Sequence, residues 1–149
     1  MFKHILVATD GSKLAGKGIK AGVKLAAALG ARVTGVYVIL PYMPPVYGEA
    51  AMYYVPGLSP QEYEKSAERA ARKALSAIEV LAKTAGVRCT TRSVTASRPY
   101  EGILRAARAA KCDAICMATH GRGGLGGLIL GSETQRVLAH SKIPVIVTR

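Results

Sequence analysis

The chain has 149 residues, of which 50% are hydrophobic, and a formal net charge of +12. This is the length of one ordinary domain, so we expect residues 1–149 to form a single domain with a buried core. The sequence has no apolar run of about 18 residues, and its apolar N-terminal segment stops at Asp10. These features argue against a transmembrane helix and a secretory signal, so we expect a cytoplasmic protein without a membrane partner.

The first part of the chain alternates strand and helix patterns. Residues 5–8 form a short, continuous apolar run, which is typical of a strand buried on both faces. Residues 13–29 are rich in Lys, Ala and Leu and end at Gly30, which predicts a helix. Residues 36–39 predict a second strand. Residues 40–58 then form a long connection rich in Pro and Tyr, either functional or disordered, whose aromatic content favours a packed flap.

The middle of the chain contains two predicted helices around a polar strand. Ser59 and Glu62 form a capping box that opens a helix running to about residue 85. Residues 87–95 are polar and β-branched, as expected for an edge strand. Residues 99–110 predict a third helix, with proline at its start.

The last part repeats the pattern once more. Residues 114–118 predict a buried strand, and residues 145–147 predict a strand at the end of the chain. Between them, Ser132 and Gln135 read as a capping box, with Ser132 as the N-cap of a short helix. The three cysteines, an odd number, disfavour a disulfide framework.

This alternation predicts an α/β fold with a doubly wound, open, five-stranded parallel sheet in the order 3-2-1-4-5 and helices on both faces. In such Rossmann-like sheets, ligands bind where the winding direction reverses, outside the carboxyl ends of the strands. We therefore expect polar chemistry at the ends of the first and fourth strands.

The sequence carries polar residues at both of these ends. The first strand ends in residues 9–12, Thr-Asp-Gly-Ser, and the fourth leads into the glycine-rich loop His120–Ser132. Glycines let backbone N–H groups approach an anion, and the loop runs into a helix N-terminus, which favours negative charge. The alternatives are an idle surface loop and a plain N-cap role for Ser132.

Asp10 lies where it could hold a divalent metal on a bound phosphate chain, or it is a turn residue in Asp-Gly. Residues 11–17 match the G-x-x-x-x-G-K phosphate loop, but Gly18 replaces the Ser or Thr that binds magnesium. Gly121, Gly123 and Gly126 fit a dinucleotide pattern that lacks the later acidic residue. Both matches are weak.

Taken together, residues 7–12, 117–122, 130–132 and 143–147 resemble the universal stress protein family over the length of the chain. The resemblance implies the five-stranded sheet, of the adenine nucleotide alpha hydrolase-like type, and a homodimer, which we expect to form through the last strand. The ATP-binding branch carries G-x-x-G, nine residues, then G-[S/T]. Here Gly121 and the pair Gly131-Ser132 match, and Ala118 stands at the first glycine.

The resemblance also implies the roles of individual site residues. It places Asp10 near phosphates or Mg²⁺, Thr9 and Val38 near ribose or adenine, and Ala118 at the ribose and phosphates. The full set of implied nucleotide-binding residues is Thr9, Asp10, Val38, Ala118, Gly121, Arg122, Gly131, Ser132 and Thr134.

The leading hypothesis is an ATP-binding regulatory protein of the stress response with little or no catalysis. The first alternative is a slow ATP hydrolase or transferase that uses Asp10 or His120. The second is a nucleotide-independent signalling or nucleic-acid-binding dimer that uses the positive charge. The basic residues recur at helical spacing without interleaved aromatics, which is typical of solvated helix faces, so nucleic acid is not the expected partner.

Overall fold

A five-stranded, wholly parallel sheet forms the centre of the fold in the computed structural model, which describes residues 1–43, 59–119 and 130–149. The strand order is β3-β2-β1-β4-β5, as the alternation of elements predicted. The strands are β1 (His4–Ala8), β2 (Arg32–Ile39), β3 (Cys89–Thr95), β4 (Ala114–Ala118) and β5 (Val145–Thr148).

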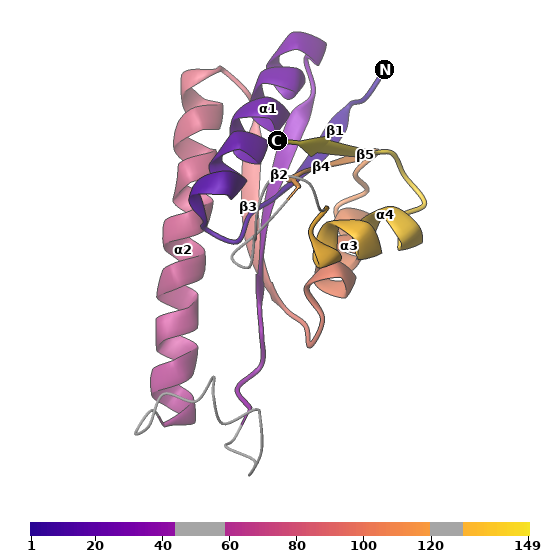
Figure 1. Cartoon of the computed structure of the whole chain (residues 1–149). Coiled ribbons are helices and arrows are strands. Elements are labelled where there is room, and N and C mark those ends of the chain that lie inside the picture. Colours follow the sequence, from indigo (N-terminus) through magenta and orange to yellow (C-terminus); the bar gives the residue numbers. More distant parts are fainter. Residues whose placement is uncertain (44–58, 120–129) are drawn as a thin grey trace.

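Helices cover both faces of this sheet, which gives three layers (Figure 1). One face carries α1 and α2, and the other carries α3 and α4. The helices are α1 (Lys13–Leu29), α2 (Pro60–Thr84), α3 (Pro99–Ala109) and α4 (Ser132–His140). In the part of the chain that the structure describes, no helix is long and apolar enough to span a bilayer.

The central strands are continuously apolar because they are buried on both faces. Along β1, Ile5 and Val7 pack into the core under α1 and α2, whereas Leu6 packs into the core under α3 and α4. All three side chains are fully buried. At the edge of the sheet, β3 alternates exposed and half-buried residues, so its polar sequence fits its position.

Local capping fixes the ends of the first two helices. The hydroxyl of Ser12 accepts a hydrogen bond from Ala15 N at 3.1 Å, and Gly30 ends α1 in the left-handed conformation. At the start of α2, both bonds of the predicted capping box between Ser59 and Glu62 are present. The hydrogen bonds to Ser59 also lower the pKa of Glu62.

The structure corrects two details of the sequence analysis. β2 begins at Arg32 rather than at residue 36, because Arg32 already pairs with His4 of β1. The prediction that Ser132 is the N-cap of α4 is wrong, because Gly131 holds that position and makes no side-chain cap. The side chain of Gln135 instead donates to Leu130 O at 2.7 Å.

A close approach between α1 and β4 sets the position of the first helix. A Cβ atom added at Gly18 would lie 2.8 Å from the backbone nitrogen of Ala118 and 3.1 Å from the carbonyl carbon of Met117. Only glycine lets the helix lie this near to the strand. Gly18, which replaces the Ser or Thr of the phosphate-loop pattern, is therefore needed for the packing of α1 on β4.

Candidate functional site

The carboxyl ends of β1 and β4 lie side by side at the centre of the sheet. Their register pairs Val7 with Cys116, and two residues further on it places Thr9 level with Ala118. β2 continues past its last pair with β1, so Val38 lies beyond the end of β1. The structure therefore brings three of the predicted site residues to the same edge of the sheet.

The turn after β1 is held by its own side chains. Thr9 is buried, and its hydroxyl accepts a hydrogen bond from Gly11 N at 3.1 Å. The Asp10 carboxylate accepts one from Ser12 N at 2.9 Å. Gly11 has a φ of 79°, a conformation that L side chains rarely adopt. Asp10 thus stabilises the turn, and its half-buried carboxylate is fixed at the strand end.

The chain leaves β4 at Thr119 and rejoins the sheet edge at Gly131. Gly131 N donates to Thr119 O at 2.8 Å, so the two ends of the connection are hydrogen-bonded to each other. Thr134 is buried, and its hydroxyl donates to the carbonyls of Ala118 and Thr119, each at 3.1 Å. These bonds anchor the first turn of α4 directly on the end of β4.

The first turn of α4 has the properties of an anion site. The backbone N–H groups of Ser132, Glu133 and Thr134 have no acceptor within the helix, because they precede its first i to i−4 bond. The helix dipole adds partial positive charge at the same place. Ser132 is exposed, so a ligand can reach this end of the helix. Thr134 has its hydroxyl engaged with the strand, and any phosphate contact would use its backbone N–H.

Ala118 and Val38 form the apolar part of this edge. Ala118 is buried against Gly18 of α1. Val38 is half-buried, and a Cβ atom added at Gly102 of α3 would lie 2.9 Å from both of its methyl groups. Val38 thus packs against α3 and Ala118 against α1, both at the carboxyl edge of the sheet.

Several predicted features lie outside the described residues. Gly121 and Arg122 fall within residues 120–129, as does His120, and most of the 40–58 connection falls within residues 44–58. The roles that the sequence analysis assigned to these residues therefore stay predictions. Within the described ranges, no cluster of three or more His, Cys, Asp or Glu side chains could hold a metal ion.

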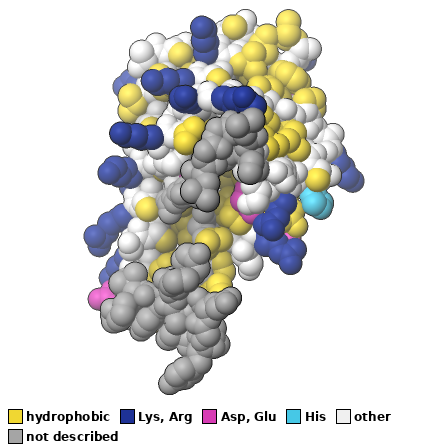
Figure 2. All heavy atoms as spheres, viewed as in Figure 1, with side chains coloured by type: hydrophobic (Ala, Val, Ile, Leu, Met, Phe, Trp, Pro, Cys, Tyr) yellow, Lys and Arg dark blue, Asp and Glu magenta, His cyan; other side chains and the backbone are white. Residues whose placement is uncertain are grey.

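Basic side chains are spread over several elements rather than gathered at one place on the face shown in Figure 2. The lysines of α1 are exposed, and its sequence contains no acidic residue. Within the described residues, ion pairs join Arg98 to Glu101 and Arg136 to Glu133. The cations elsewhere raise the general potential of the surface and so favour anionic ligands.

Sequence reasoning assigned no positive role to Glu133, which the structure places at the centre of a hydrogen-bonded cluster. Its carboxylate accepts bonds from Tyr100 N of α3 at 2.9 Å and from Arg136 of α4 at 2.6 Å. The sequence holds no signal for the first bond, because Tyr100 is distant in the chain. The second has a local signal, since the residues are three apart in a helix.

The strand order and the helices on both faces define a Rossmann-like α/β protein, and the ends of β1 and β4 meet at its carboxyl edge. The sequence profile of the Universal stress protein family matches residues 1–149, and the chain belongs to this family. A universal stress protein from Thermus aquaticus is 36% identical over 150 residues, which cover 100% of both chains.

Solved structures agree with this assignment. A protein of the universal stress protein family from Burkholderia pseudomallei is 26% identical, and the match covers 98% of this chain and 95% of that one, with a TM-score of 0.74. A universal stress protein in complex with cAMP is 22% identical over 99% and 97% of the two chains, with a TM-score of 0.71. At this identity, the similarity to the structure with cAMP shows a shared fold.

Proposed function

We propose that this protein binds an adenine nucleotide, ATP, at the carboxyl edge of β1 and β4 and acts as a regulatory protein of the stress response. The observation that carries the proposal is the first turn of α4, whose N–H groups are anchored at the carboxyl end of β4, the strand that pairs with β1. Membership of the family and a relative in complex with cAMP support an adenine nucleotide as the ligand.

The described residues divide into two parts around such a ligand. Val38 and Ala118 supply apolar surface for the ribose and base, next to Thr9. Gly131, Ser132 and Thr134 supply backbone N–H groups for phosphate oxygens. Gly121 and Arg122 remain predicted contacts of the same ligand.

Asp10 suits a magnesium ion bound jointly with the nucleotide. Mg²⁺ in nucleotide sites is held through one or two carboxylates and the phosphates rather than by an all-protein cage. The fixed carboxylate at the end of β1 and the absence of a three-residue cluster in the described ranges fit this arrangement. In that position Asp10 would orient the ion toward the phosphates.

Binding is favoured over turnover by the state of the polar groups at this edge. The hydroxyls of Thr9 and Thr134 and the carboxylate of Asp10 each bond to nearby backbone. These bonds hold the two hydroxyls in place, and in this proposal the Asp10 carboxylate serves as a metal ligand rather than as a base that activates water. We therefore propose that nucleotide occupancy is the signal.

The proposal is tested by replacing one backbone donor. Proline is tolerated as the first residue of a helix, and the extended ψ of 142° at Gly131 suits the residue before a proline. Ser132→Pro thus removes one N–H from the first turn and preserves the helix. Ser132→Ala is the matched control, because it also lacks the hydroxyl and retains the N–H.

Calorimetric titration with ATP and magnesium measures the difference between the two variants. A hydrogen bond to a charged group contributes about 1.5–3 kcal/mol, so Ser132→Pro should bind about tenfold to a hundredfold more weakly than Ser132→Ala. Equal affinities would exclude the first turn of α4 as the phosphate site. No binding of ATP, AMP or cAMP by the wild-type protein would refute the proposed function.

We also propose that the protein forms a homodimer through β5. Each residue of Val145–Thr148 is half-buried, and β4 is the strand that pairs with it. An apolar edge strand of this kind favours pairing with a second chain. Light scattering at micromolar concentration should give the mass of a dimer for the wild type and of a monomer for Ile146→Lys. A monomeric wild-type protein would contradict the proposal.

A further inference from the structure

Glu133 lies in the first turn of α4, but its carboxylate serves a different helix. One oxygen accepts a hydrogen bond from Tyr100 N of α3 at 2.9 Å, and the other accepts one from Arg136 at 2.6 Å. An acidic residue at this position commonly interacts with the N-terminus of its own helix. Here the side chain turns away from that N-terminus and toward α3.

The start of α3 lacks a local cap. Its N-cap residue, Arg98, makes no side-chain cap hydrogen bond, and Pro99 has no N–H. Tyr100 therefore carries the first N–H group of the helix. The carboxylate of Glu133 accepts from it and so replaces the missing cap from a neighbouring element.

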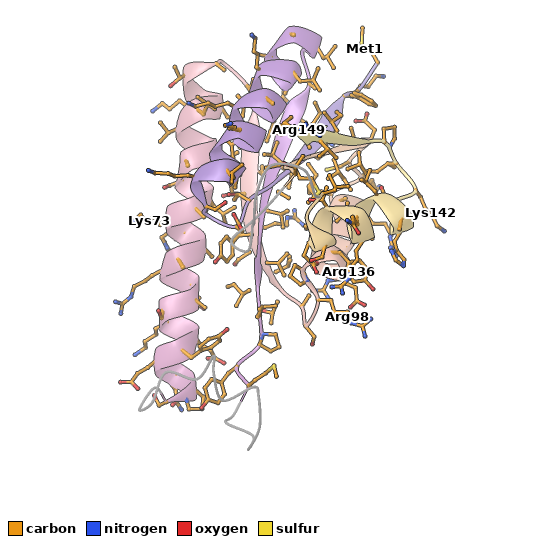
Figure 3. The ribbon with its side chains drawn as sticks, viewed as in Figure 1. Met1, Lys73, Arg98, Arg136, Lys142 and Arg149 are labelled. Carbon is orange, nitrogen blue, oxygen red and sulfur yellow. The ribbon has the colours of Figure 1, made fainter. Side chains whose placement is uncertain are left out.

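Further contacts join the same two helices. The rings of Tyr100 and His140 lie with their centroids 5.1 Å apart, and the guanidinium carbon of Arg136 lies 6.0 Å from the centre of the Tyr100 ring. Figure 3 shows Arg136, in the middle of α4, and Arg98, just before α3, toward the same side of the two helices in this view. The first turn of α4 is thus attached to α3 through Glu133 and to β4 through Thr134.

We propose that Glu133 is a positioning residue for the phosphate site. Its bond to α3 holds the first turn of α4 in one orientation and so aims the N–H groups of Ser132 and Thr134 at the ligand. The same bond keeps the negative carboxylate away from the phosphates. This inference rests on the proposed nucleotide-binding function.

A purely structural cap would behave differently. It would stabilise α3, and its loss would weaken the binding of every ligand of the site to a similar degree. A positioning residue for phosphate affects the phosphate contribution alone. The ratio of the dissociation constants of adenosine and AMP measures this contribution, because the two ligands differ only in the phosphate.

The experiment compares Glu133→Ala with Glu133→Gln by titrating each with adenosine and with AMP. Glutamine retains an oxygen that can accept from Tyr100 N, and alanine does not. Glu101→Ala is the matched control, because it removes an exposed carboxylate that pairs with Arg98 and accepts from the Tyr100 hydroxyl, but leaves the bond from Tyr100 N to Glu133 in place. Amide hydrogen exchange at Tyr100 reports the loss of the cap directly.

We expect Glu133→Ala to lower the adenosine-to-AMP ratio about tenfold and to speed exchange at Tyr100. Glu133→Gln and Glu101→Ala should remain within about threefold of the wild type. An unchanged ratio in Glu133→Ala, or an equal loss in Glu133→Gln, would overturn the positioning role while nucleotide binding by the wild type stands. Failure of the wild type to bind either ligand would refute the proposed function itself, and the positioning role with it.

Discussion

Gly18 and Gly16 lie two residues apart in α1 but face different surroundings. A Cβ atom at Gly18 would come within 2.8 Å of the backbone of β4, whereas a Cβ atom at Gly16 would meet nothing within 4 Å. Alanine is favoured over glycine in a helix by about 0.8–1.0 kcal/mol, so both substitutions carry a similar intrinsic gain. The difference between their effects on stability therefore isolates the contact with β4.

The contact is with backbone atoms, which cannot rotate away as a side chain can. Overpacking of this kind costs about 1–3 kcal/mol, so Gly18→Ala should be about 1–3 kcal/mol less stable than Gly16→Ala. Urea denaturation measures both free energies of unfolding. Because α1 must also move away from Ala118, Gly18→Ala should weaken nucleotide binding and Gly16→Ala should not. Equal stabilisation by both substitutions would refute the close approach.

Three further predictions concern buried groups. Thr134→Val keeps the side-chain shape but leaves two carbonyls at the end of β4 without their hydroxyl donor, and it should lower the free energy of unfolding by about 1–3 kcal/mol, measured in urea. Burial lowers the pKa of His4 from 6.5, so the unfolded chain takes up the proton first as the pH falls. The contribution of His4 to the free energy of unfolding should be fully present above about pH 6.5 and should decline as the pH falls from there through the lower pKa of the folded state. Urea midpoints measured at several pH values should show this decline in the wild type and a smaller decline in His4→Gln. Burial raises the pKa of the thiols of Cys112 and Cys116 to about 11 and also raises the pKa of Cys89, but Cys89 alone is half-buried rather than buried. A thiol reagent should therefore label Cys89 first in the folded protein, and equal labelling rates would contradict this order.

Much of the fold could be predicted because local signals and burial agree along most of the chain. Apolar runs such as residues 114–118 have the pattern that two-sided burial requires. Gly30 and the Ser59–Glu62 capping box mark helix ends through bonds made within a few residues. Parallel topology then follows from the alternation of strands and helices, and the topology brings Thr9 beside Ala118.

The features that sequence reasoning missed depend on contacts between distant segments. Ser132 and Gln135 satisfy the capping pattern, but the first helical bond runs from Gln135 N to Gly131 O, and Gly131 is itself bonded through its N–H to Thr119 O, so the helix starts one residue earlier. The sequence shows Gly18 only as a mismatch to the phosphate-loop pattern, because its contact is with β4, a strand distant in the chain. The bond between Glu133 and Tyr100 joins two helices whose relative position no local pattern encodes.

The hydrogen bond between Gly131 and Thr119 has a consequence for how well the fold tolerates a change in the intervening segment. It joins the two ends of residues 120–130 at the edge of the sheet, and Thr134 secures the downstream end. The residues that flank the segment are therefore held in place by bonds that do not involve the segment itself. A segment of another length or composition should therefore fit between these ends without altering the strand order. Grafting the corresponding segment from a relative should leave the host fold intact.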